Sequence, residues 1–323
     1  MNDRTIVDLK ENDVLEGYFV IKECRVAKTK KGDDYIRITI ADKSGSIQGT
    51  IFNIESKGYN ADEWNQKGFV KACFKVGSYN DKPQANFDWI EGVSQDEVED
   101  ISLILQAAPL EQEFMMNELM TLINNIEDVD YKYIVKSIYG KKMLMDAFKK
   151  IPAGKSMHHD YIYGLLYHTY RMANAAVALS GVYTSANKDL LVAGTVLHDV
   201  GKVMEFEINS NGLVENYTKY GNLLGHLYMG ANFVGSLRPD ETCTKDFNEK
   251  KLLLQHMLLS HHGIPEYGAV KIPSFFEAYL LHAIDLIDSR ADMFENTSKT
   301  LKPGESSSRI FGLDTCVYKP DIE

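Results

Sequence analysis

The sequence predicts a multidomain α+β protein, in which an N-terminal five-stranded β-barrel precedes an all-α helical bundle. Apolar residues alternate with polar ones over most of residues 14–92, which is the period of half-buried strands. From residue 114 onward they recur at helical spacing instead. All nine histidines lie after residue 157, so the two parts of the chain carry different side-chain chemistry.

The first domain is predicted to span residues 1–95. In the second predicted strand Ile36, Ile38 and Ile40 face one way, and the residues between them face the other. A polar, helical insert is expected at 55–67. The expected strands are residues 14–28, 34–42, 46–53, 69–77 and 84–92. Three strands, a short helix and two more strands is the element order of an OB-fold, so an OB-like barrel is predicted.

The remainder is predicted to be helical as far as residue 300. Residues 96–150 are expected to form a helical connector, residues 151–300 a second domain, and residues 301–323 a loop-like tail. Asn187 and Ser274 are the expected N-caps of two helices. The helices of the second domain are expected at about 159–180, 187–200, 219–236, 246–260 and 274–296.

Composition excludes several classes of protein. The 323 residues are 44% hydrophobic and 25% charged, which is enough for two cores. No stretch approaches the roughly 18 apolar residues of a membrane span, so no membrane partner is expected, and residues 1–10 lack a signal-peptide core. The four cysteines form no CxxC pair, which excludes a disulfide scaffold and a thiolate zinc finger and favours the cytoplasm.

The net charge of −11 does not exclude a nucleic-acid partner. Residues 1–95 hold 14 basic and 15 acidic side chains, so this part is nearly neutral and has room for a basic face. Binding of a polyanion depends on the local potential and not on the charge of the whole chain.

A series of histidines and aspartates follows the predicted helices of the second domain. Its members are His168, His198-Asp199, His226, His261-His262 and Asp285. Imidazole nitrogens and carboxylates bind the divalent metals of hydrolytic sites, and rigid helices can direct them at one centre. The two oxygens of Asp199 could be shared by two cations, which polarise a phosphoryl oxygen and generate hydroxide near neutral pH. Taken singly, His256 and His282 are expected to be structural.

This ordered series resembles that of the HD-domain phosphohydrolase superfamily over roughly residues 151–295. The resemblance implies a first metal held by His168, His198, Asp199 and Asp285. It also implies a second metal held by Asp199, His226 and His261, with His262 as a further ligand.

The same resemblance assigns neighbouring residues. Lys202 would meet a substrate phosphate, although a solvated lysine at a helix end is the alternative. His158 and His159 either contact substrate or are polar residues at a helix start. Asp288 and Arg290 would support the metal ligands from behind.

A narrower resemblance covers nearly the whole chain. The shared phrases are Ser156-Met157-His158-His159, Gly164-Leu165-Leu166-Tyr167-His168-Thr169, Leu197-His198-Asp199-Val200-Gly201-Lys202, Leu259-Ser260-His261-His262-Gly263 and Val317-Tyr318-Lys319-Pro320. They resemble the YhaM-type 3′-5′ exoribonucleases, also described as Cmp-binding-factor-type proteins. Tyr167 departs from that family, which usually has Glu before the histidine. The resemblance implies metal-dependent, 3′-to-5′ removal of nucleotides from single-stranded RNA, and often from DNA. Two divalent ions are expected, manganese first, with iron, cobalt, nickel or zinc also compatible with these ligands.

The barrel carries candidate contacts where an OB-fold binds a single strand, on the second and third strands and on two loops. The candidates are Lys28, Lys30 and Lys31 in the first loop, Tyr79 and Lys82 in the loop between the last two strands, and Tyr35, Arg37 and Phe52 on the outward face. The alternative is a solvated hairpin edge, with Phe52 packed on a neighbouring element.

These observations predict a cytoplasmic, metal-dependent exonuclease that releases nucleoside 5′-monophosphates through a metal-activated hydroxide. Asp199 would organise the hydroxide, and Lys202 would neutralise charge developing on phosphorus. Two rivals stay open: an HD phosphohydrolase of nucleotides or cyclic dinucleotides, and a non-catalytic single-strand-binding or replication-associated protein. No GYP follows His261-His262-Gly263, which weakens the cyclic-dinucleotide version. Homo-oligomer formation and the role of the tail are left open.

Overall fold

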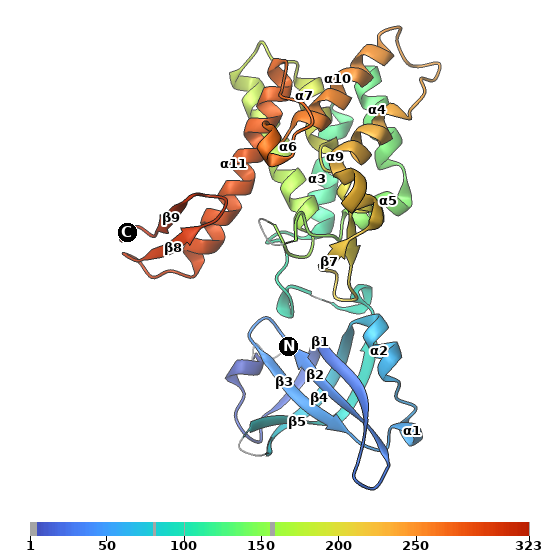
Figure 1. Cartoon of the computed structure of the whole chain (residues 1–323), viewed down its shortest axis with the longest axis vertical. Helices are drawn as coiled ribbons and strands as arrows, with labels where there is room; N and C mark the ends of the chain where they lie inside the picture. The colour runs from blue at the N-terminus through green and yellow to red at the C-terminus, as the bar shows by residue number, and fades with distance from the viewer. Residues whose placement is uncertain (1–4, 80–81, 100, 156–158, 323) are drawn as a thin grey trace. The chain divides into compact units, whose positions relative to one another are not determined.

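The computed structural model describes residues 5–79, 82–99, 101–155 and 159–322, and the chain divides into two compact units (Figure 1). The first unit contains Met1–Ala107 together with Ile208–Leu213. The second contains Ala108–Glu207 and Val214–Glu323. The helices of the predicted connector therefore belong with those of the second domain.

The first unit is a closed five-stranded barrel with the order β1-β2-β3-β5-β4. All neighbouring strands are antiparallel except β3 and β5, which pair in parallel. The elements of the barrel are β1 (Val14–Lys28), β2 (Asp34–Ala41), β3 (Ser46–Ile51), α1 (Ile54–Lys57), α2 (Ala61–Lys67), β4 (Phe69–Tyr79) and β5 (Lys82–Val93), with short 3₁₀ turns at Ile6–Asp8, Gln95–Glu97 and Ile101–Leu103. The predicted OB-like barrel is confirmed.

Alternation along the strands explains why this barrel closes. Ile36, Ile38 and Ile40 are fully buried, whereas Arg37 between them is exposed. The helical insert begins where the side chain of Asn60 accepts hydrogen bonds from two backbone N–H groups of α2.

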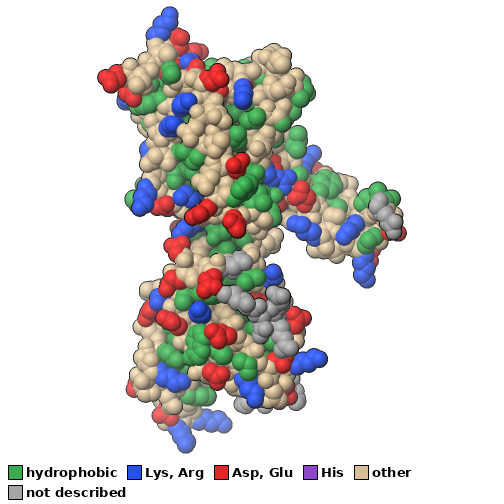
Figure 2. Space-filling model, turned by 180° about the vertical axis from the view of Figure 1, so that it is seen from behind, with side chains coloured by type: hydrophobic (Ala, Val, Ile, Leu, Met, Phe, Trp, Pro, Cys, Tyr) green, Lys and Arg blue, Asp and Glu red, His purple; other side chains and the backbone are tan. Residues whose placement is uncertain are grey.

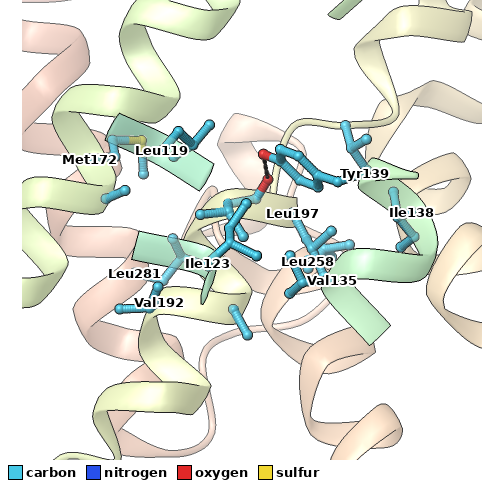
Figure 3. Packing of buried hydrophobic residues seen from close by; sticks show 14 of the residues in the cluster. Leu119, Ile123, Val135, Ile138, Tyr139, Met172, Val192, Leu197, Leu258 and Leu281 are labelled. Carbon is cyan, nitrogen blue, oxygen red and sulfur yellow. Dashed lines mark hydrogen bonds between the residues drawn. The ribbon is translucent and has the colours of Figure 1, made fainter. Parts of the chain in front are cut away.

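The second unit is a bundle of helices with two short hairpins. Its elements are α3 (Gln112–Asn124), α4 (Val129–Tyr139), α5 (Lys142–Phe148), α6 (Gly164–Val182), α7 (Lys188–Leu197), α8 (Lys202–Glu205), β6 (Phe206–Ile208), β7 (Val214–Tyr217), α9 (Lys219–Gly235), α10 (Phe247–Ser260), a 3₁₀ turn at Pro265–Tyr267, α11 (Phe276–Lys299), β8 (Ser306–Ile310) and β9 (Thr315–Tyr318). Among the described residues, apolar side chains from eight of these helices, α3 to α7 and α9 to α11, meet in one core. Figure 3 labels Leu119 and Ile123 of α3, Val135, Ile138 and Tyr139 of α4, Met172 of α6, Val192 and Leu197 of α7, Leu258 of α10 and Leu281 of α11.

Two helix starts test the predicted caps. The side chain of Asn187 accepts a hydrogen bond from the N–H of Leu190 at 3.0 Å, so this N-cap is confirmed. The N-cap predicted at Ser274 is wrong, because α11 begins one residue later with Phe275 as its N-cap. The hydroxyl of Ser274 instead donates to the carbonyl of Ile272.

The first helix of the predicted second domain begins at Gly164 and not at residue 159. His159 and Tyr163 both have positive φ angles, which end any regular helix. The carbonyl of His159 accepts a hydrogen bond from the N–H of Ala153, so the chain turns back on itself before α6.

The sequence pattern did not predict the two hairpins of the second unit. The predicted all-helical region contains β6 and β7, and the predicted loop-like tail contains β8 and β9. These strands are three to five residues long and mostly exposed, which is too short for a period-two pattern to be recognised.

In the described part of the chain, no helix combines the length and apolarity needed to cross a bilayer. On the face drawn in Figure 2, acidic and basic side chains are interspersed over both units.

The core makes a testable prediction at Tyr139, whose hydroxyl donates to the carbonyl of Val196 at 2.8 Å inside the bundle (Figure 3). Tyr139→Phe leaves that buried carbonyl without this donor, so the free energy of unfolding should fall by about 1–3 kcal/mol. The matched control is Tyr133→Phe, because the Tyr133 hydroxyl also donates to a backbone carbonyl, but an exposed one. Urea denaturation followed by circular dichroism compares the two, and equal losses would contradict the expected effect of burial.

Candidate metal centre

Five helices bring the predicted histidine and aspartate series together. His168 lies on α6, His198 ends α7 and is followed by Asp199, and His226 lies on α9. His261 and His262 follow the last residue of α10, and Asp285 lies on α11. Their donor atoms form overlapping groups in which all members lie within 4.8 Å of one another.

The five histidines of this series are oriented in the same way. In each ring Nδ1 faces a hydrogen-bond acceptor on the far side of the imidazole. The pairs are His168 with Asp288, His198 with the Thr195 carbonyl, His226 with Glu205, His261 with the Leu258 carbonyl, and His262 with the Tyr267 carbonyl. Carbonyl and carboxylate oxygens only accept, so Nδ1 carries a proton in each ring and Nε2 is the nitrogen that faces the other donors of the centre.

Two of these bonds follow directly from local sequence. His198 and His261 each cap a helix, where the last carbonyls have no intrahelical partner. Each ring bonds the carbonyl three residues earlier, at 2.7 Å for His198 and 2.9 Å for His261. A histidine placed directly after a helix is thereby fixed with Nε2 facing away from that helix.

The first group of donor atoms lies between α6, α7 and α11. His168 Nε2 is 3.2 Å from His198 Nε2 and 3.3 Å from Asp285 Oδ1. His198 Nε2 is 3.2 Å from Asp199 Oδ2. Ligand atoms that share one ion at about 2.1 Å lie roughly 3 Å apart, so this group fits a divalent cation.

The second group lies on the other side of the same carboxylate. Asp199 Oδ1 is 3.4 Å from His226 Nε2 and 3.6 Å from His261 Nε2. His226, His261 and His262 form a further set of donors within 4.8 Å of one another. Asp199 Oδ1 and His226 Nε2 are buried and make no hydrogen bond to any described residue. Buried polar atoms rarely lack a partner, and a cation would satisfy both.

The carboxylates of this centre are held in the ionised form. Burial by itself raises the pKa of Asp199, but His198 and Lys202 bring it well below its ordinary value. For Asp285 burial also raises the pKa, but the hydrogen bond from His168 together with the nearby charges of His168, His261 and His198 lowers it strongly. Both groups therefore present negative charge.

The histidines differ in their electrostatic surroundings. Burial lowers the pKa of His261, and burial lowers that of His262 to about 3, so both are neutral as metal ligands require. Burial also lowers the pKa of His168, but hydrogen bonds to Asp285 and Asp288 outweigh this effect and raise the pKa to about 9. This position favours a positive charge, which either a proton or a bound cation supplies.

Lys202 is buried against the centre. Its Nζ lies 2.7 Å from Asp199 Oδ2 and donates to the carbonyl of Ala153 at 2.6 Å. Burial opposes its charge, yet Asp199 raises its pKa above the ordinary value. The solvated lysine considered as an alternative is not what the structure contains, whereas the phosphate contact stays a prediction.

His159 lies behind His168, fully buried. Its Nε2 is 2.8 Å from Asp288 Oδ2, the same oxygen that His168 Nδ1 approaches at 2.7 Å. Its other ring nitrogen is 2.6 Å from the hydroxyl of Tyr161, and its backbone N–H donates to Asp292 at 2.8 Å. This position favours support of His168 over contact with substrate.

The other predicted residues divide between the centre and its surroundings. Asp288 also forms an ion pair with Arg171, whose Nε is 2.6 Å from Asp288 Oδ1, while the buried Nε of Arg290 has no hydrogen-bond partner among the described residues. His158 falls outside the described residues. His256 Nε2 accepts the N–H of Ser274, and His282 Nδ1 is 2.9 Å from the carbonyl of His261.

Sequence reasoning assigned such support to Asp288, which contacts His168, but it missed other residues that contact the histidine rings from behind. Glu205 contacts His226, while Tyr161 and Asp292 contact His159. A single acidic residue in a helix carries no pattern that would reveal such a contact. Tyr167 is the position at which the sequence departs from the YhaM-type family. Its ring packs edge-on against His159, with 5.6 Å between the ring centroids, and the guanidinium group of Arg171 lies over it.

The barrel brings together part of its predicted binding face. The rings of Tyr35 and Phe52 lie 5.6 Å apart, and Phe52 is 54% exposed rather than packed on a neighbour. Arg37 donates to Gln48 on the adjacent strand at 3.1 Å. Lys30, Lys31 and Lys82 are exposed, and Lys28 pairs with Asp34 at 3.1 Å. The side chain of Tyr79 lies outside the described part.

A helical bundle with this histidine and aspartate centre defines an HD-domain protein, and the HD domain family matches residues 165–290. The 3′-5′ exoribonuclease YhaM of Listeria welshimeri serovar 6b is 31% identical over 324 residues, which cover 99% of this chain and all of that protein. The chain belongs to the YhaM family, and it is an enzyme of the hydrolase class.

Asp288 provides a test of how the centre is held. Asp288→Asn removes the charge that orients His168, so the affinity for one Mn²⁺ ion should fall by about 10- to 100-fold. Isothermal titration calorimetry measures it. Glu295→Gln is the control, because Glu295 contacts the same Arg171 from the exposed side. Wild-type affinities in Asp288→Asn would show that Asp288 does not orient a ligand.

Proposed function

We propose that this chain is a metal-dependent 3′-5′ exonuclease that removes nucleotides from single-stranded RNA, and also from single-stranded DNA, as nucleoside 5′-monophosphates. The observation that carries the proposal is the buried carboxylate of Asp199, whose oxygens face two separate groups of histidines. The polarity and the RNA substrate are those in the name of the YhaM relative.

The donor set supports two divalent cations, one on each side of Asp199. The first would be held by His168, His198, Asp199 and Asp285, and the second by Asp199, His226, His261 and His262. Nitrogen and oxygen donors in this mixture suit manganese, with iron, cobalt, nickel or zinc as compatible alternatives. When bound, such a pair of ions activates water near neutral pH and stabilises charge on a phosphoryl group.

The chain's own groups contribute orientation and charge. Lys202 holds Asp199 Oδ2 and carries the positive charge nearest to it, so it is suited to offset charge that develops on a phosphate bound at the centre. His262 is only partly buried and Asp285 is 17% exposed, so substrate would approach from this side of the centre.

The barrel would bind the single strand. Tyr35 and Phe52 offer adjacent aromatic rings for base stacking, and Arg37 and the loop lysines offer positive charge for phosphates. Base stacking tolerates any sequence, because every base has a π-face. Such a surface would suit an enzyme that degrades strands of any sequence.

The central test of the proposal is Asp199→Ala. Removal of the shared carboxylate should lower hydrolysis by at least about 10³-fold, while binding of single strands stays close to wild type. The assay uses 5′-labelled RNA and DNA with Mn²⁺ or with a chelator. A ladder that shortens from the 3′ end, absent with chelator, is the expected result. Glu266→Ala, an exposed acidic change, serves as control.

Retained hydrolysis in Asp199→Ala, or no product from wild type with any of the compatible metals, would refute the enzyme proposed here. Faster hydrolysis of free nucleotides than of oligonucleotides would instead favour a small-molecule phosphohydrolase.

The binding face is tested by Phe52→Ala. Loss of one stacked base costs about 1–3 kcal/mol, so the dissociation constant for an oligouridylate should rise by about 5- to 150-fold. Fluorescence anisotropy measures it. The control is Trp89→Ala, which removes an exposed ring on β5, paired with Cys73, and should change binding by less than about 3-fold. Equal effects of the two changes would contradict the assignment of this face.

A further inference from the structure

Glu205 is a buried carboxylate that contacts His226 at two points. Its Oε1 accepts the backbone N–H of His226 at 3.0 Å. The Nδ1 of the same residue lies 3.0 Å from Oε1 and 2.9 Å from Oε2. The side chain of Glu205 is 8% exposed and that of His226 is 12% exposed, so water competes little for these bonds.

The backbone contact exists because α9 is broken immediately before His226. Gly225 has φ 72° and ψ 159°, a conformation that glycine adopts at low cost and that interrupts the helix. The N–H of His226 cannot then bond four residues back and needs another acceptor. Glu205 supplies it, and its negative charge lies at the start of the continuing helical segment, where such charge is stabilising.

The side-chain contact fixes which nitrogen of His226 is free. A carboxylate only accepts hydrogen bonds, so Nδ1 must carry the proton. Nε2 is then the nitrogen that faces the metal centre; it is buried, makes no hydrogen bond to any described residue, and lies 3.4 Å from Asp199 Oδ1. Glu205 thus sets both the position and the tautomer of this ring.

Glu205 is itself held firmly. It ends α8, the single helical turn that begins with Lys202, so the two ends of this turn hold Asp199 and His226. The carbonyl of Glu205 accepts the N–H of Thr218 at 2.9 Å. A Cβ at Gly221 would overlap that carbonyl, so the close packing requires glycine there.

We propose that Glu205 is the positioning residue for the second metal ion, the counterpart of Asp288 at the first. This role rests on the proposed function, because it requires the two-ion centre described above. Outer partners of this kind typically change metal affinity by 10- to 100-fold. Loss of Glu205 should therefore weaken the binding of the second ion selectively, while the ion near His168 stays bound.

The experiment measures Mn²⁺ stoichiometry and affinity by calorimetry in the full chain, with His226→Ala to identify the second ion. Wild type should bind two ions. Glu205→Gln should lower the affinity for one ion by about 10- to 100-fold, and this should be the same ion that His226→Ala removes. Glu207→Gln is the matched control, because Glu207 is exposed and lies two residues further on. Two ions with wild-type affinities in Glu205→Gln would overturn the proposal.

A second measurement needs no variant at Glu205. Nitrogen-15 NMR of histidine-labelled, metal-free wild-type protein reports the tautomer of His226, which His226→Ala assigns by loss of its signal. The proposal requires a proton on Nδ1, and a neutral ring with its only proton on Nε2 overturns it even if every variant at Glu205 fails to fold. Wild type that binds fewer than two ions would instead refute the two-ion centre of the proposed function, and the role of Glu205 with it.

Discussion

The buried carboxylate of Asp199 is the group around which the second unit is organised. A buried negative charge is costly unless donors or cations surround it, and here each oxygen has its own surroundings. Oδ2 lies beside His198 and the ammonium of Lys202, while Oδ1 faces His226 and His261. The helices α7, α8, α9 and α10 must converge to supply these groups, and α7, α9 and α10 also contribute apolar side chains to the common core.

Direction matters as much as proximity at this centre. An imidazole can point either nitrogen at a metal, and a side chain held only by its own rotamer would sample both arrangements. Each of the five histidines instead has Nδ1 bonded to an acceptor, from a helix-end carbonyl, a loop carbonyl or a buried carboxylate. The donors are thus oriented before any ion arrives, which reduces the reorganisation needed for binding.

The sequence predicted much of the fold because two kinds of pattern are local. Alternation in β2 follows from the pleat of a strand, so the burial of Ile36, Ile38 and Ile40 could be read directly. Asn187 could be recognised as a cap because its bond spans three residues. Ser274 has the right side chain for a cap, but its hydroxyl donates to the nearby carbonyl of Ile272 and its N–H donates to His256, 18 residues earlier in the chain.

The sequence alone determined the OB-like barrel with its element order and the candidate ligands from His168 to Asp285, because periodicity, turn chemistry and motif spacing are properties of neighbouring residues. Only the tertiary structure decided what supports them. Glu205 and His226 are 21 residues apart, and His159 and Asp288 are 129 apart. Contacts over such separations depend on how helices pack, so the contact of His159 with Asp288 and that of Glu205 with His226 are visible only in three dimensions.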